Sequence, residues 1–170
     1  LFRSSCNLGS TNIVNLMKSP DFERSVDVAV RALTFVTDHS SIDAVPTVKN
    51  GNSKAHTIGL GAMGLHTFFA LNQMEYGSPE SIEATDLYFR MLNFYTLKAS
   101  NKIAKERGKS FEGFERSKYA TGEYFESYIA EDVQIQSDKV KKIFAKLPIP
   151  TAEDWKQLKE DVMSGGLYHQ

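Results

Sequence analysis

The fold class of this sequence depends on one stretch, SCNLGSTNIVNL at residues 5–16. Small polar residues alternate there with apolar ones, and Thr11, Ile13 and Val14 are β-branched, which favours an extended backbone. Gly9 allows a kink between two extended halves. Because the remainder of the chain shows helical patterns, this stretch predicts one strand, or two short extended pieces, in a chain that is otherwise mainly helical.

The residues that follow predict an amphipathic helix from Ser19 to about Thr37. Ser19, Pro20 and Asp21 are a capping hydroxyl, a first-turn proline and an acidic residue, in the order typical of a helix N-terminus. Apolar residues then recur at spacings of three and four, which predicts one buried face. These residues are Phe22, Val26, Ala29, Val30, Leu33 and Val36.

Residues 39–71 divide into a predicted loop and a predicted buried helix. Residues 39–54 are polar and are interrupted by one proline and one glycine, which is typical of a long loop. Residues 57–71, TIGLGAMGLHTFFAL, contain no charged residue and are apolar on nearly every side, which indicates a helix enclosed by the rest of the fold. His66 in this helix is expected to be a hydrogen-bonded core histidine rather than a general base.

The same stretch contains a literal G-x-G-x-x-G pattern at Gly59, Gly61 and Gly64. In dinucleotide-binding folds such glycines let the backbone approach a pyrophosphate where a strand turns into a helix. Here residues 50–56 before the pattern are polar and do not resemble a strand. We therefore favour a packing role, in which the glycines keep a buried helix thin, over a nicotinamide enzyme.

The C-terminal half of the sequence predicts helices joined by short loops. The longest should run from Ser78 to Gly108, between a Ser-Pro-acidic start and a glycine stop. Thr151 and Asp154 resemble a capping box that opens a last helix, which closes at Gly165. With a loop around Phe111 to Phe114, the chain should contain about six helices; the two not yet named are expected near residues 121–130 and 137–146.

Composition limits the class of protein. The 170 residues, 41% hydrophobic and 24% charged, have the size of one ordinary domain. Twenty basic against 21 acidic residues give a net charge of −1, which does not favour nucleic acid or an anionic membrane. No secretory signal and no membrane span is evident, so we expect a cytoplasmic chain. It begins at Leu1 and ends on a segment that starts after Gly166, as expected for a piece of a larger protein.

Few side chains are candidates for chemistry. The four histidines share no metal-ligand spacing, and no carboxylates form an obvious acid/base pair, so we expect no metal and no cofactor on this segment; the histidines are His39, His56, His66 and His169. Cys6, the one cysteine, could be an inert small hydrophobic residue. Its small polar neighbours instead favour a thiol that a substrate and an external reductant can reach.

Six stretches together resemble the catalytic alpha (large) subunit of class Ib aerobic ribonucleotide reductases. The similarity runs in order from Ser5 onward, without large gaps, but covers only about a quarter of such a subunit. The stretches are SCNLGSTNIVNLM (5–17), SPDFERSV (19–26), HTIGLGAMGLH (56–66), YGSPES (76–81), ERGKSFEGFERSKYATGEYF (106–125) and GLYHQ (166–170). By this resemblance, residues 1–170 are a single partial domain of a ten-stranded α/β barrel, to which residues 5–16 contribute one strand.

The resemblance also implies a reaction. In this family a thiyl radical removes the 3′ hydrogen of a ribonucleoside diphosphate, the 2′ hydroxyl leaves as water, and two cysteines supply two electrons and become a disulfide. Cys6 matches the second cysteine of that reducing pair, with Ser5 and Asn7 shaping its surroundings. The implied partners are the diphosphate substrate, a radical-generating beta subunit with a metal-tyrosyl radical, nucleotide effectors, a thioredoxin- or glutaredoxin-like reductant and a second alpha subunit.

The radical cysteine, its acid/base loop and the phosphate loop of the family have no counterpart in this sequence, so the chain alone is expected to be catalytically silent. An alternative of another class remains open, a non-enzymatic helical interaction domain in which Cys6 is inert.

Overall fold

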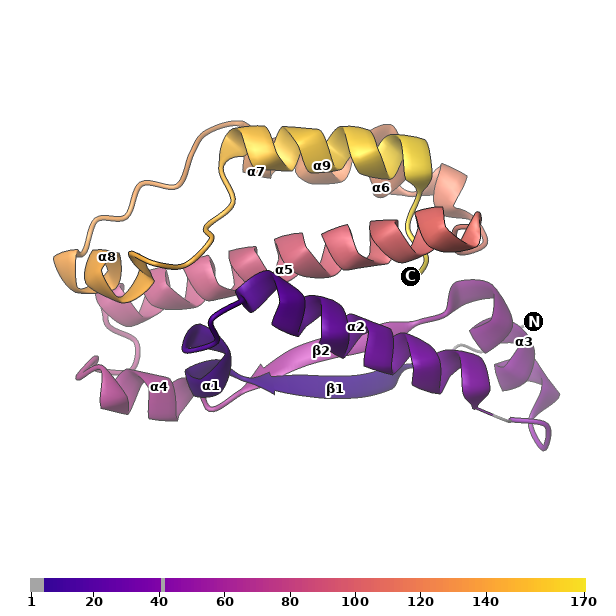
Figure 1. The fold of residues 1–170 in the computed structure, drawn as a ribbon, viewed down its shortest axis with the longest axis horizontal. Helices are drawn as coiled ribbons and strands as arrows, with labels where there is room; N and C mark the ends of the chain where they lie inside the picture. Colours follow the sequence, from indigo (N-terminus) through magenta and orange to yellow (C-terminus); the bar gives the residue numbers. More distant parts are fainter. Residues whose placement is uncertain (1–4, 41) are drawn as a thin grey trace.

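The computed structural model describes residues 5–40 and 42–170. Its described part contains one sheet of two parallel strands, β1 (Asn7–Asn12) and β2 (Ile58–Met63), with a register that runs from Asn7 opposite Ile58 to Asn12 opposite Met63 (Figure 1). The single predicted strand is therefore corrected to two. The sheet is open rather than closed into a barrel.

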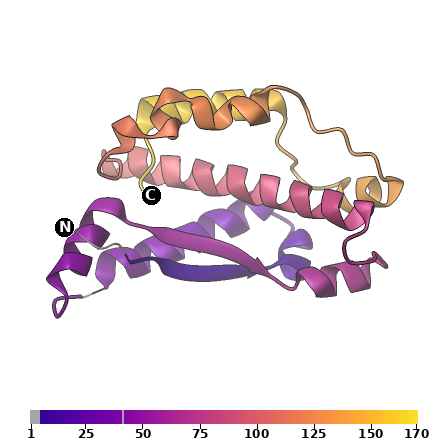
Figure 2. The ribbon, with the colours of Figure 1, turned by 180° about the vertical axis from the view of Figure 1, so that it is seen from behind.

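Helices cover one face of this sheet. Along β1, Asn7, Gly9 and Thr11 are half-buried, whereas Leu8, Ser10 and Asn12 are exposed. The half-buried set faces helix α2 (Phe22–His39), because a Cβ at Gly9 would lie 3.4 Å from Leu33 Cδ2. Figure 2 shows the strands from the opposite side, with no helix drawn in front of them. The sheet is thus one-sided within the described residues.

The predicted strand at residues 5–16 is shorter than expected. Ile13–Met17 forms the short helix α1, and the Asn12 side chain accepts a hydrogen bond from the Asn15 N–H at 3.1 Å. A capping asparagine thus turns the chain out of β1 before its β-branched residues Ile13 and Val14 can extend it.

Helix α2 is confirmed, although its cap differs. The N-cap is Asp21, which accepts the Arg24 N–H at 2.8 Å. Ser19, the expected cap, accepts the Asp21 N–H instead. Both oxygens suit a cap, and the structure uses Asp21, two residues later in the chain than expected.

The charge-free stretch at residues 57–71 was predicted wrongly as one buried helix. It contains β2, followed by the helix α4 (Leu65–Leu71), and His66 is exposed rather than in the core. A short apolar run does not by itself distinguish a strand from a buried helix. The glycines decide it, because glycine weakens a helix interior and Gly64 adopts φ +83° at the start of α4.

The predicted loop at residues 39–54 contains the helix α3 (Pro46–Ala55). Pro46 stands at the start of this helix, where a missing N–H costs nothing. The helix ends at His56, whose backbone is left-handed with φ 47°. Proline was therefore a start signal here and not a loop signal.

Helix α5 (Pro79–Arg107) has the predicted limits. The Ser78 side chain accepts the Ser81 N–H, and Gly108 ends the helix in the left-handed conformation. In Figure 1 it runs the length of the molecule, between the layer of α2 with the sheet and the layer of α9 (Ala152–Gly165). The capping box of Thr151 and Asp154 at the start of α9 is confirmed.

The helix expected at residues 121–130 is divided. Gly122, with φ +79°, separates α6 (Lys118–Thr121) from the 3-10 turn Glu123–Phe125, which α7 (Glu126–Ile129) follows. A 3-10 turn also forms at Phe114–Arg116, and α8 (Asp138–Phe144) fits the helix predicted at 137–146. The described residues therefore hold nine α-helices where about six were expected.

The core lies where α5 meets α2 on one side and α9 on the other. Trp155 of α9 is fully buried, with its ring centroid 5.0 Å from Phe94 of α5 and 4.1 Å from Tyr128. None of the described helices is long and apolar enough to cross a membrane.

Candidate functional site

Cys6 lies just before β1 with its thiol exposed. It belongs to the uncovered face of the sheet, which we call the thiol face and define by Cys6, Leu8, Ser10, Gly59 and Gly61. Leu8 on this face is 78% exposed. The only contact of the sulfur that resembles a hydrogen bond among the described residues is a long one of 3.9 Å to the Asn7 carbonyl oxygen. The thiol is therefore accessible, as its small polar neighbours predicted.

Gly59 of β2 makes room for this thiol. A Cβ at Gly59 would lie 2.6 Å from Leu8 Cδ2 and 3.3 Å from Cys6 Sγ, both closer than ordinary van der Waals contact. The equivalent atom at Gly61, two residues along the same face, would lie 3.6 Å from Ser10 Oγ. The absence of a side chain at Gly59 thus shapes the immediate surroundings of Cys6.

Asn7 and Ser5 were predicted to shape the same surroundings. The Asn7 side chain is on the covered face, where its Nδ2 donates to Thr37 Oγ1 of α2 at 2.7 Å. The structure therefore does not bring the Asn7 amide beside the thiol, but it ties the beginning of β1 to α2. Ser5 is half-buried, next to Cys6 in the chain.

The glycine pattern lies in a different context from the one expected. Gly59 and Gly61 are inside β2, and only Gly64 stands between the strand and a helix. A dinucleotide fold instead places its glycines in the turn, before a long helix; α4 has only seven residues. The packing role is retained, with the correction that the glycines serve a strand and not a thin helix.

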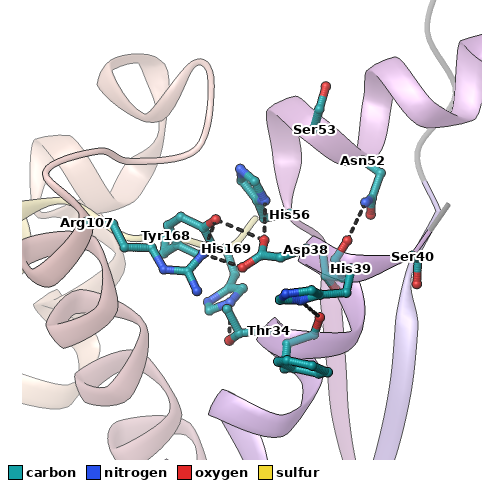
Figure 3. Close-up of polar contacts among 12 residues, drawn as sticks. Thr34, Asp38, His39, Ser40, Asn52, Ser53, His56, Arg107, Tyr168 and His169 are labelled. Atoms are coloured by element: carbon teal, nitrogen blue, oxygen red, sulfur yellow. Dashed lines mark hydrogen bonds and ion pairs between the residues drawn. The ribbon is translucent and has the colours of Figure 1, made fainter.

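A second polar region lies beyond the covered face of the sheet, where the ends of α2, α3 and α5 meet the C-terminal segment (Figure 3). It surrounds a cavity of about 510 Å³, which we call the Tyr168 cavity. Its described lining consists of Thr37, Asp38, His39, Ser40, Ile42, Lys49, Asn52, Ser53, His56, Arg107, Lys109 and Tyr168.

Asp38 is at the centre of this region. Its carboxylate accepts hydrogen bonds from Arg107 Nη1 and, at 3.0 Å, from the Tyr168 hydroxyl. Burial alone would raise the pKa of Asp38, but these two hydrogen bonds and the Arg107 charge outweigh it and hold that pKa below its ordinary value. The carboxylate therefore stays ionised and orders the two side chains around it.

His169 is held as a neutral ring. Its Nε2 lies 2.9 Å from Thr34 Oγ1 of α2 and its Nδ1 lies 2.9 Å from Ser100 Oγ of α5. Burial, with a smaller contribution from His56, lowers the pKa of His169 to about 4. Because Thr34 donates its own hydrogen to the Val30 carbonyl, the ring N–H points from Nε2 to Thr34.

His56 is buried against Tyr168, with ring centroids 4.3 Å apart and an interplanar angle of 26°. Its Nδ1 lies 3.3 Å from Asp38 Oδ1. Burial, followed by the positive charge of Lys109, lowers the pKa of His56. Sequence reasoning missed this region, because its members come from four segments and share no spacing; the terminal GLYHQ was noticed only as part of a resemblance.

No metal centre is found in residues 5–40 and 42–170, where no three His, Cys, Asp or Glu side chains are arranged to hold an ion. His39, like His66, is exposed, and its Nδ1 lies 2.9 Å from the Phe35 carbonyl oxygen.

Comparisons with known proteins all match the chain to the same protein family. The family model described as "Ribonucleotide reductase, barrel domain" matches residues 2–170. The chain is similar to "Ribonucleoside-diphosphate reductase subunit alpha" of Bacillus subtilis (strain 168), at 44% identity over 97% of this chain and 24% of the relative. It is 41% identical to the protein of the same name from Mycoplasma pneumoniae, over 96% of this chain and 23% of the relative. The chain thus spans about a quarter of the length of these relatives.

Proposed function

Because this chain belongs to the ribonucleotide reductase barrel-domain family, we propose that it is the part of a ribonucleoside-diphosphate reductase alpha subunit that carries one thiol of the reducing pair. That thiol is Cys6. The reaction of the parent protein is the reduction of a ribonucleoside diphosphate to the deoxyribonucleoside diphosphate, and we assign the parent to class Ib.

The proposed chemistry balances with two thiols. A thiyl radical elsewhere in the parent protein removes the 3′ hydrogen of the ribose and later returns it. The 2′ hydroxyl leaves as water, and Cys6 with a second cysteine outside this chain gives up two electrons and two protons and forms a disulfide. A thioredoxin- or glutaredoxin-like dithiol then attacks that disulfide and restores both thiols.

The observation that supports this role best is the position of Cys6 on the thiol face. A reducing thiol must meet a substrate on one occasion and an external thiolate on another, so it needs an accessible sulfur on a fixed backbone. The exposed Cys6 side chain provides the first requirement. The hydrogen bond from Asn7 to Thr37 provides the second, because it anchors the next residue to α2.

The one-sided sheet supports the wider proposal. In the parent subunit, the thiol face of β1 and β2 would face the interior of a ten-stranded barrel, and residues 1–170 would be one part of that domain. Helices then cover the outer face, as α2 does here. We propose that the parent subunit pairs with a second alpha subunit and with a beta subunit whose metal-tyrosyl radical starts the reaction, that nucleotide effectors regulate it, and that this segment alone does not turn over substrate.

The test is Cys6→Ser in the full-length alpha subunit. Serine keeps the size of the side chain but cannot form the disulfide, so steady-state deoxyribonucleotide formation with a dithiol reductant should fall to background. Ser10→Ala, on the same face of β1, is the matched control and should keep normal turnover. Unimpaired turnover of Cys6→Ser would contradict the assignment and favour a helical interaction domain with an inert cysteine.

A further inference from the structure

The Tyr168 cavity carries an excess of positive charge. Lys49, Arg107 and Lys109 line it, and Asp38 is the one acidic residue among its described lining residues. The Asp38 carboxylate is already bound by Arg107 and by the Tyr168 hydroxyl. An anion entering the cavity would therefore meet uncompensated positive charge and no free carboxylate.

Among the three cations that line the cavity, Lys109 is the one without an ion pair in the described part of the chain. Its Nζ lies 5.4 Å from the centroid of the Tyr168 ring. None of the ion pairs found in the described part of the chain involves Lys109, whereas Lys49 pairs with Asp43 and Arg107 with Asp38. The positive charge of Lys109 also acts on His56, whose pKa it lowers in addition to the effect of burial. Two groups that disfavour each other's charge would both gain from an anion between them.

Two buried polar atoms in the cavity wall have no hydrogen-bond partner. Asn52 Oδ1 is one, since the Asn52 amide uses only its Nδ2, which donates to the Thr37 carbonyl at 2.9 Å. His56 Nδ1 is the other, and it lies 3.3 Å from Asp38 Oδ1, whose carboxylate already accepts from Arg107 and Tyr168. Each residue is only 7% exposed. Buried polar atoms are nearly always paired, so Asn52 Oδ1 indicates a missing partner.

The backbone at His56 supports the same conclusion. Its φ of 47° is uncommon for a residue other than glycine. This conformation ends α3 and holds the imidazole over Tyr168 at the cavity wall. Such strained positions are concentrated at binding and active sites.

We propose that the Tyr168 cavity binds a phosphate-class anion, either free phosphate or the phosphoryl group of a small ester. Lys109 and Arg107 supply positive charge, His56 supplies a ring nitrogen, and Asn52 Oδ1 accepts a hydrogen from a protonated phosphate oxygen or an ester hydroxyl. Because Asn52 Oδ1 can only accept a hydrogen bond, the cavity should prefer phosphate to sulfate. Near neutral pH phosphate keeps a proton to donate, whereas sulfate has none. This role goes beyond the reductase function and does not depend on Cys6.

The test measures binding to the full-length alpha subunit by calorimetry, with inorganic phosphate, glycerol phosphate and sulfate as separate probes at constant ionic strength. Wild-type protein should bind at least one of the two phosphates, and more tightly than sulfate. Binding of glycerol phosphate alone would identify an ester as the ligand. No binding of either phosphate, or equal affinity for sulfate, would overturn the proposal.

Two variants assign the binding to this cavity. Lys109→Gln removes an exposed charge and should lower the affinity for phosphate about tenfold or more, as expected for one charge-assisted contact. Lys142→Gln, an exposed lysine of α8 outside the cavity, is the charge-matched control and should bind like wild type. His56→Asn should also lose affinity, with the left-handed backbone kept because asparagine tolerates it. Any other phosphate site of the subunit is present in every variant, so equal affinity in wild type and Lys109→Gln would overturn the assignment.

Discussion

The thiol face and the Tyr168 cavity hold their polar groups in opposite ways. On the thiol face, Cys6 is exposed, its nearest neighbours are small or apolar, and Gly59 has no side chain that would press on the sulfur. Around the Tyr168 cavity, the ionised Asp38 and Arg107 hold each other and the buried Tyr168 hydroxyl, and the buried neutral ring of His169 lies between two hydroxyl groups. A reactive thiol requires access, whereas a buried polar region requires partners. The comparison predicts that substitutions in the cavity change stability and substitutions on the thiol face change reactivity.

The largest expected effect on stability is a pH dependence at His169. Its pKa is about 4 in the folded chain and near 6.5 when unfolded, so between these values protons bind the unfolded state first. Stability should therefore be complete above pH 6.5 and should fall as the pH drops towards 4, by up to about 3 kcal/mol. The midpoint of thermal unfolding, measured from pH 7.5 down to pH 4, follows this loss.

His169→Gln should flatten that dependence, because glutamine does not titrate. His66→Gln, which changes an exposed histidine on α4, is the control and should leave the pH dependence as it is. If both variants kept the wild-type slope, the buried network around His169 would not be the source, and the contrast between the two regions would fail on the cavity side.

The next effect is expected at Asp38. Asp38→Asn keeps the shape of the side chain but removes the charge that pairs with Arg107. With the carboxylate largely buried, the loss should be about 2 kcal/mol in the free energy of unfolding. The control is Asp43→Asn, in an exposed pair with Lys49, where a loss of about 0.5 kcal/mol or less is expected. Denaturant titration of both variants would refute the contrast if the two losses were equal.

Sequence reasoning succeeded where a helix limit or an exposed side chain depends only on neighbouring residues in the chain. Ser78 and Gly108 bound α5 through their own side chain and backbone, and the capping box at Thr151 needs only residues up to Asp154. The accessibility of Cys6 likewise followed from its immediate neighbours. Its redox role stays a prediction, which Cys6→Ser tests. The influence of Ser5 and Asn7 on its surroundings also stays a prediction.

Sequence reasoning failed where a structure depends on contacts between residues that are far apart in the chain. β2 is a strand because it pairs with β1, some fifty residues earlier, and its charge-free pattern fits a buried helix equally well. The Tyr168 cavity was missed for the same reason, since Asp38, Arg107 and Tyr168 meet only after α2, α5 and the C-terminal segment have packed. Residues that are brought together by strand pairing and helix packing have no fixed spacing in the sequence, so no motif reveals them.

The smallest expected effect on stability, and the sharpest test of the thiol face, is Gly59→Ala. The new methyl group would displace Leu8, whose exposed side chain can move, so the loss of stability should be under about 1 kcal/mol. It would also press on Cys6 Sγ, which must give by a few tenths of an ångström. Because a misplacement of 1 Å can cost about 100-fold in rate, turnover in the full-length subunit should fall several-fold.

Gly61→Ala, on the same face but against Ser10, should leave both turnover and the alkylation rate of Cys6 unchanged. Equal behaviour of the two glycine variants would mean that the space beside the sulfur does not set its reactivity, and the thiol face would then differ from the cavity in exposure alone.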